Sequence, residues 1–164
     1  MHDIEFRLVE KLLQFKMTIA TCESCTGGLI SKRITNVPGA SEVFGYGVCT
    51  YANEAKVKLL GVSVTTLENF GAVSQNTALE MAGGMLSLSG ADIAISTTGI
   101  AGPGGGTETK PVGLVYTAIA CKDGYRECKK LLLGSIPNAD RENIRIAASS
   151  EAMSLALGYL EKTK

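Results

Sequence analysis

Ser24 lies in the segment Glu23-Ser24-Cys25-Thr26-Gly27-Gly28, between an apolar run that ends at Thr21 and an amphipathic run that begins at Leu29. This change of pattern predicts a strand-to-helix turn, which exposes a serine hydroxyl to a substrate and makes Ser24 a candidate nucleophile. Free N–H groups in such a turn can stabilise an oxyanion. The candidate donors are the N–H groups of Cys25, Thr26, Gly27 and Gly28. The alternative is an ordinary glycine-rich turn with Thr26 as a helix cap.

A serine nucleophile needs a base, and the only histidine, His2, lies in the first turn of the chain, where order is least assured. Glu23 would point away from Ser24 in an extended segment. Lys56 follows a predicted strand and opens a helix, with Tyr51 nearby as a hydrogen-bond donor. A lysine acts as a base at neutral pH only when burial or a neighbouring cation lowers its pKa. The residues alone do not choose Lys56 over Lys32, Lys58 or Lys110.

A second candidate site is the glycine-rich stretch 99–107, which follows another predicted strand. Ligands of open α/β sheets bind beyond the carboxyl ends of the strands, so this loop and the Ser24 turn can share one crevice. The loop lacks the Gly-Lys-Ser/Thr of a Walker loop, yet its N–H groups and the Thr98 hydroxyl can bind a phosphate or carboxylate. A flexible surface loop is the alternative. The candidate phosphate-binding residues are Gly99, Gly102, Gly104 and Gly105.

Arg141 and Arg145 are four residues apart near the start of the predicted last helix, where the helix macrodipole disfavours cations. Asp140 and Glu142 can offset that cost at the surface. Alternatively, an anionic ligand lies between the arginines and the glycine-rich loop.

The five cysteines, an odd number, indicate reduced thiols. Cys22 and Cys25 form a C-x-x-C, which is compatible with a dithiol redox protein or a zinc site. A zinc site needs a second ligand pair, and the other cysteines are dispersed. We therefore expect buried, inert thiols and no metal.

The whole chain has 164 residues, 45% apolar and 20% charged, which predicts one compact domain over residues 1–164. Sixteen basic residues balance sixteen acidic ones, so the charge footprint of a nucleic-acid-binding protein is missing. Residues 1–11 resemble neither a signal peptide nor a membrane span. We expect a cytoplasmic protein with no nucleic-acid or membrane partner.

Apolar spacing and turn residues give the order of the expected elements. Helices are expected at 4–15, 29–37, 53–60, 74–90 and from Asn138 or Asp140 to 160; strands are expected at 17–21, 43–51, 92–97, 112–121 and 125–133. The last two strands flank Asp123-Gly124, a favoured hairpin turn. The fold class is therefore α/β: a three-layer α/β/α domain with a mixed, mainly parallel sheet that includes one β-hairpin.

Several motifs in one order resemble the CinA C-terminal domain family, over about residues 5–160. The resemblance rests on E-S-C-T-G-G (23–28), P-G-A-S (38–41), T-Y-A-N-E-A-K (50–56), G-A-V-S (71–74), T-G-I-A-G-P (98–103), K-P-V-G (110–113) and D-R-x-x-x-R (140–145). It implies an amidase that converts nicotinamide mononucleotide and water to nicotinate mononucleotide and ammonia in pyridine-nucleotide recycling. It also implies no metal or other cofactor, a small-molecule nucleotide as the only substrate partner, and a homo-oligomer.

The resemblance makes Ser24 the nucleophile and Lys56 its base. The pocket residues that it implies are Ser41, Tyr51, Thr98 and an arginine of the last helix, Arg141 in preference to Arg145. Two departures from the family pattern are Cys22, where alanine is frequent, and Ala52, where serine is frequent. Neither falls on the serine–lysine pair. The alternative function is a catalytically silent module that binds or senses a nucleotide.

Overall fold

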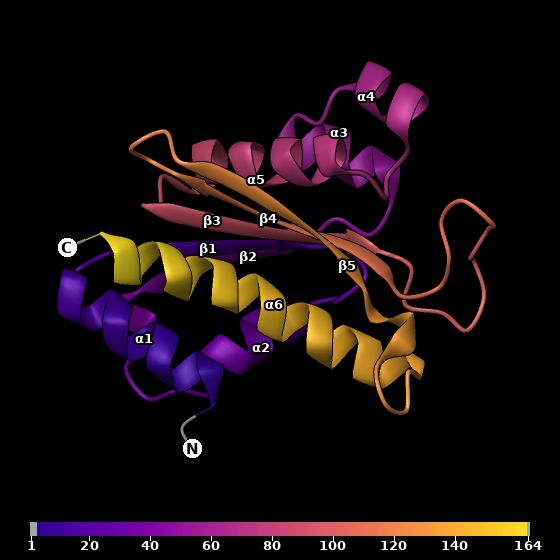
Figure 1. The fold of residues 1–164 in the computed structure, drawn as a ribbon. Coiled ribbons are helices and arrows are strands. Elements are labelled where there is room, and N and C mark those ends of the chain that lie inside the picture. The colour runs from indigo at the N-terminus through magenta and orange to yellow at the C-terminus, as the bar shows by residue number, and fades with distance from the viewer. Residues whose placement is uncertain (1–2, 164) are drawn as a thin grey trace.

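The computed structural model describes residues 3–163. It contains a five-stranded sheet in the order β2-β1-β3-β4-β5 (Figure 1). The strands are β1 (Ile19–Glu23), β2 (Phe44–Cys49), β3 (Ile93–Gly99), β4 (Leu114–Cys121) and β5 (Arg126–Leu132). Every residue of β1 is buried, because this strand lies between two neighbours and under helices on both faces.

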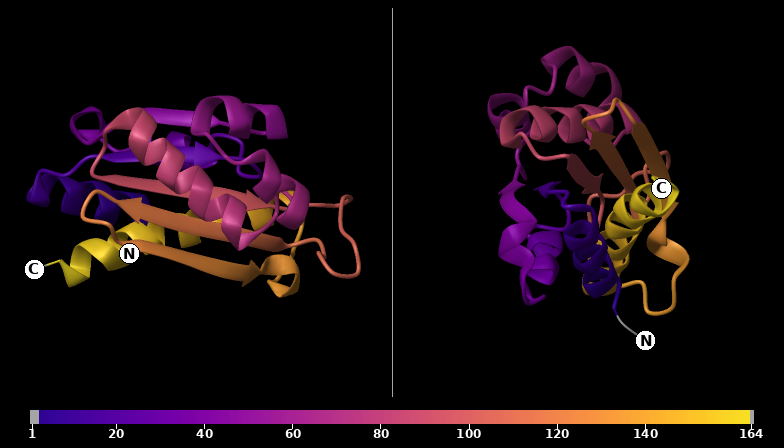
Figure 2. Two further views of the ribbon diagram at one scale, coloured as in Figure 1. Left: turned by 90° about the horizontal axis from the view of Figure 1, so that it is seen from above. Right: turned by 90° about the vertical axis from the view of Figure 1, so that its left-hand side faces the viewer.

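Helices cover both faces of the sheet, which confirms the expected three-layer α/β/α arrangement (Figures 1 and 2). One face carries α1 (Ile4–Phe15), α2 (Leu29–Thr35) and α6 (Arg141–Lys162). The other carries α3 (Asn53–Leu60), α4 (Val64–Phe70) and α5 (Gln75–Ser89). Two short 3-10 helices, η1 (Ala40–Glu42) and η2 (Leu133–Ser135), precede β2 and follow β5.

The sheet is mixed, mainly parallel in strand direction and includes the expected hairpin, because β4 alone runs against the other four strands. β1 pairs parallel with β2 and β3, whereas the β3–β4 and β4–β5 pairs are antiparallel. The physical reason is the connection between β3 and β4: the glycine-rich loop returns the chain without a crossover helix, so β4 must run back beside β3. Gly124, with a φ of 97°, supports the tight β4–β5 turn.

Side-chain caps fix the start of two helices where the sequence predicted them. Ser74 accepts a hydrogen bond from the N–H of Thr77 at the start of α5. Asp140, rather than Asn138, caps α6 by accepting from the N–H of Asn143 at 2.8 Å. Helix α4 was not expected. None of the helices in the described residues is long and apolar enough to cross a membrane.

Candidate active site

The carboxyl ends of β1, β2 and β3 bring together part of the candidate residues, with Ser24 and Lys56 at the centre. Ser24 follows β1, and its N–H donates to the carbonyl of Thr97 in β3 at 3.0 Å. On the other side of β1, the N–H of Thr50 donates to the carbonyl of Glu23 at 2.8 Å. These two bonds hold the nucleophile turn between its neighbouring strands. Ser24 therefore lies at the carboxyl end of β1, between β2 and β3, where ligands of open α/β sheets bind.

Lys56 is the lysine that reaches Ser24. Its side chain enters from α3 and is 1% exposed, and Ser24 is 9% exposed. Nζ lies 3.2 Å from Ser24 Oγ and donates to the carbonyl oxygens of Thr50 at 2.7 Å and Tyr51 at 3.4 Å. Lys58, on the same helix, is exposed. The structure therefore identifies Lys56 as the lysine beside Ser24, which the sequence alone did not.

Burial lowers the pKa of Lys56 below its ordinary value of 10.5. A neutral amine has two N–H bonds and one lone pair. When the carbonyls of Thr50 and Tyr51 take the two N–H bonds, the lone pair is left to accept the proton of Ser24. The surrounding backbone therefore orients the lone pair of the amine toward the Ser24 hydroxyl. A backbone carbonyl has no signature in the sequence, so the part played by Thr50 was missed.

The lowered pKa of Lys56 predicts how the reaction depends on pH. Below that pKa the group is an ammonium, which cannot take a proton; above it the group is an amine. We expect the rate at which Ser24 attacks an electrophile to rise with pH through one ionisation below 10.5. A pH–rate profile measures this midpoint. Lys58→Met should leave it unchanged, and a midpoint at the ordinary lysine value would contradict the prediction.

The nucleophile turn offers two free oxyanion donors rather than four. The N–H of Gly27 donates to the Ser24 carbonyl at 3.0 Å, and that of Gly28 donates to the Glu23 carboxylate at 3.0 Å. Within residues 3–163, the N–H groups of Cys25 and Thr26 donate to no carbonyl, carboxylate or hydroxyl, and that of Cys25 faces its own thiol. The expectation is therefore wrong for Gly27 and Gly28, and Cys25 and Thr26 remain candidates.

The Thr26 side chain is not a helix cap. Its hydroxyl lies 2.7 Å from the Thr97 hydroxyl, in the buried layer between the sheet and α6. Glu23 provides the cap of α2 instead. Thr98 is 1% exposed and donates its hydroxyl to the Ala72 carbonyl at 2.7 Å. Because Glu23 is paired with Thr97, the next positions, Ser24 and Thr98, are neighbours at the edge of the sheet.

The two arginines of α6 have different partners. Arg141 donates to the Gly102 carbonyl at 2.6 Å and to the Tyr51 hydroxyl at 2.9 Å. It thereby joins the glycine-rich loop to the segment that carries Lys56. Arg145 donates instead to the carbonyls of Cys25 at 3.2 Å and Thr26 at 2.6 Å. Arg145 therefore supports the turn that follows Ser24. Arg141 lies where the glycine-rich loop meets the segment before α3.

The remaining candidates are only partly brought together. Gly99 ends β3 instead of opening the loop, and Gly102 is buried and bonded to Arg141. Gly104 and Gly105 lie in the exposed part of the loop, which extends past the end of the sheet (Figures 1 and 2). Ser41 is exposed in η1, before β2. It therefore lies near the amino ends of the parallel strands, whereas Ser24 follows the carboxyl end of β1. Within a single chain, Ser41 therefore lies outside the site around Ser24.

The C-x-x-C does not form a dithiol. Cys22 packs with the residues under α5, and Cys25 packs with those under α6, so the two thiols lie in different clusters on opposite faces of the sheet. All five cysteines are free. Burial raises the pKa of Cys25 to about 12 and also raises that of Cys22, which disfavours a reactive thiolate. His2 lies outside the described residues.

A search of known families agrees with the motifs and the geometry. The model of the CinA C-terminal domain matches residues 1–160. The chain belongs to the CinA C-terminal domain family. A protein of Caldicellulosiruptor saccharolyticus named as competence-damage inducible is 56% identical over 150 residues, 92% of this chain and 35% of that protein. A CinA-like protein of Desulfovibrio desulfuricans is 51% identical over 93% of this chain and 35% of its own length.

Solved structures show the same CinA fold. The crystal structure of a competence/damage inducible protein from Agrobacterium tumefaciens has a TM-score of 0.91 at 41% identity, covering 98% of this chain and 97% of that one. A CinA superfamily protein from Klebsiella pneumoniae has a TM-score of 0.90 at 32% identity, covering 97% and 96%. The chain spans about a third of the length of the curated relatives that it matches.

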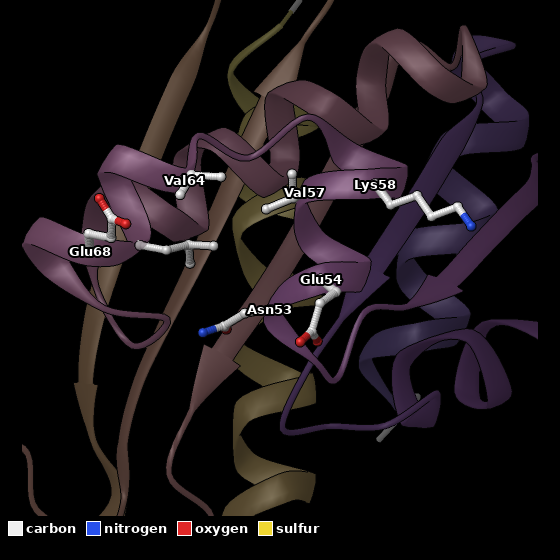
Figure 3. A pocket seen from close by; sticks show the side chains of 7 residues that line it. Asn53, Glu54, Val57, Lys58, Val64 and Glu68 are labelled. Atoms are coloured by element: carbon white, nitrogen blue, oxygen red, sulfur yellow. The ribbon is translucent and has the colours of Figure 1, made fainter.

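A separate cavity of about 470 Å³ lies between α3 and α4 of this CinA domain (Figure 3). Val57 of α3 and Val64 of α4 point toward one another, and Lys58 points away from them. Asn53 and Glu54 belong to its lining, but Ser24 and Lys56 do not. The cavity is therefore lined by the helix that carries Lys56, but it includes neither Ser24 nor Lys56.

Proposed function

We propose that this CinA domain hydrolyses the carboxamide of nicotinamide mononucleotide, giving nicotinate mononucleotide and ammonia. One observation carries the proposal: the buried amine of Lys56 lies 3.2 Å from the hydroxyl of Ser24. A serine beside a lysine of lowered pKa is suited to acyl transfer. The choice of nucleotide comes from the family resemblance, and Arg141 beside the glycine-rich loop supplies a cation for its phosphate.

In the first half-reaction, Ser24 Oγ attacks the carboxamide carbon while Lys56 takes the hydroxyl proton. The new C–O bond converts the carbonyl oxygen to an oxyanion, which the N–H groups of Cys25 and Thr26 stabilise. Lys56 then gives its proton to the amide nitrogen, and the C–N bond breaks to release ammonia. The product is an ester between the nicotinoyl group and Ser24.

The second half-reaction uses the same groups with water as the nucleophile. Lys56 takes a proton from water, the hydroxide attacks the ester carbon, and the C–O bond to Ser24 breaks. The proton on Lys56 returns to Ser24 Oγ, which restores the enzyme. The new carboxylic acid loses its proton to the solvent, and nicotinate mononucleotide leaves as a carboxylate.

The position of Arg141 predicts that its loss weakens nucleotide binding without slowing the chemical step. Its guanidinium is bonded to Tyr51 and Gly102 and not to the reacting serine. Arg141→Gln should raise KM for the nucleotide roughly tenfold to a hundredfold, because a charge-assisted hydrogen bond to phosphate is lost, with little change in kcat. Steady-state kinetics with nicotinamide riboside, which has no phosphate, is the control. An equal effect on both substrates would contradict the assignment.

Ammonia release from nicotinamide mononucleotide by the purified protein tests the function. Ser24→Ala should remove the release, because no other hydroxyl in the described residues is hydrogen-bonded to Lys56. The exposed Ser87→Ala variant, on α5, is the control. If the wild-type protein binds the nucleotide without releasing ammonia, the catalytically silent binding module replaces the amidase.

A further inference from the structure

The Glu23 carboxylate is completely buried and accepts four hydrogen bonds from the segment that follows Ser24. Oε2 accepts from the N–H groups of Gly28 and Ile30, both at 3.0 Å. Oε1 accepts from the N–H and the hydroxyl of Ser31, both at 2.9 Å. The exposed fraction of Glu23 is 0%. These four bonds account for every acceptor position that two carboxylate oxygens offer.

Glu23 and Ser24 occupy adjacent positions at the end of β1, so their side chains point to opposite faces of the sheet. The carboxylate anchors the first turn of α2 on one face, and the hydroxyl faces Lys56 on the other. Residues 25–27 therefore connect Ser24 to the start of α2, which the Glu23 carboxylate holds in place.

We propose that Glu23 is a positioning residue for the nucleophile: it fixes the turn so that Ser24 meets Lys56 and the N–H groups of Cys25 and Thr26 stay free. Glu23 acts with Arg145 from opposite sides. The carboxylate accepts hydrogen bonds from N–H groups after the turn. The Arg145 guanidinium donates hydrogen bonds to the carbonyls of Cys25 and Thr26 within it. The inference rests on Ser24 being the nucleophile of the proposed function.

Glu23→Gln is the direct test, because an amide has one acceptor oxygen and one donor group. The donor end must face either the N–H groups of Gly28 and Ile30, which costs two bonds, or Ser31, which costs the bond from the Ser31 N–H because only the hydroxyl can turn to accept. Glu80→Gln is the matched control. Glu80 is half-buried and accepts two hydrogen bonds, from the Ser63 N–H and the Thr66 hydroxyl at the start of α4, away from Ser24.

The readout is the rate at which a fluorophosphonate labels Ser24, followed by mass spectrometry. The serine oxygen forms a bond to phosphorus and fluoride leaves, so the product is a phosphonate ester. We expect Glu23→Gln to lower the maximal labelling rate roughly a hundredfold with the half-saturating concentration unchanged. Glu80→Gln makes the same chemical change away from Ser24 and should label at the wild-type rate. A wild-type labelling rate in Glu23→Gln, or no labelling of Ser24 in the wild-type protein, would overturn the proposal.

If Glu23→Gln does not fold, Ser31→Ala carries the test. It removes one of the four donors and should lower the labelling rate roughly fivefold, and an unchanged rate would overturn the proposal. Because labelling needs no nucleotide, the two proposals fail separately. Slower labelling of Glu23→Gln in a protein that does not hydrolyse nicotinamide mononucleotide would support Glu23 and refute the proposed substrate.

Discussion

Lys56→Met should lower kcat for nicotinamide mononucleotide by roughly three orders of magnitude and leave the protein folded. The amine is the only base within hydrogen-bonding distance of Ser24 Oγ in the described residues, and loss of a general base typically costs 10²–10⁴-fold. Methionine has nearly the length of the lysine side chain, so it fills the same buried space. Single-turnover kinetics measures the chemical step directly.

Lys58→Met is the matched control, since Lys58 lies two positions further along α3 and is exposed. It loses the same charge and should keep the wild-type kcat. A comparable loss in both variants would mean that the charge of α3, not the base at Ser24, determines the rate. Nucleotide binding by Lys56→Met, measured by calorimetry, should persist because Arg141 is unchanged.

The same substitution has a second, thermodynamic signature. The folded state lowers the pKa of Lys56, so between that value and 10.5 the unfolded chain binds more protons than the folded one. The free energy of unfolding of the wild-type protein therefore rises with pH across this window. Lys56→Met lacks the titrating group, and its unfolding free energy should lose this slope. Urea unfolding at several pH values measures the difference.

The elements around the site were predictable because local patterns set them. The apolar run before Ser24, the two glycines after it and the Asp123-Gly124 turn each have one dominant local solution, and the structure adopts all three. Helix α4 is different. None of its seven residues is buried, so it has no apolar stripe for a periodicity argument to detect.

The chemistry of the site depended on tertiary placement that the sequence does not encode locally. Lys56 and Lys58 look alike in the sequence, and only the packing of α3 buries one and exposes the other. Glu23 was excluded correctly as a base, because it points away from Ser24, but its role as an anchor was missed. A carboxylate shortly before Gly-Gly and a helix is the signal that could have suggested it.

The site also depends on a close contact between two helices on the same face of the sheet. Gly84 of α5 packs against the end of α3, which carries Lys56. A Cβ added at Gly84 would lie 1.8 Å from the Leu60 carbonyl oxygen, whereas real Cβ contacts are essentially never shorter than 3.0 Å. Since the neighbour is backbone, α3 itself must move by more than 1 Å.

Gly84→Ala is therefore expected to lower the free energy of unfolding by about 3 kcal/mol and kcat by roughly a hundredfold. Gly83→Ala is its matched control, because a Cβ at Gly83 meets nothing within 4 Å. That variant should gain about 0.5–1 kcal/mol from helix propensity and keep its activity. Urea unfolding and kcat, measured on both variants, test the pair. Equal stabilities would show that α3 can shift without cost, and a wild-type kcat in Gly84→Ala would show that the position of Lys56 does not depend on this contact.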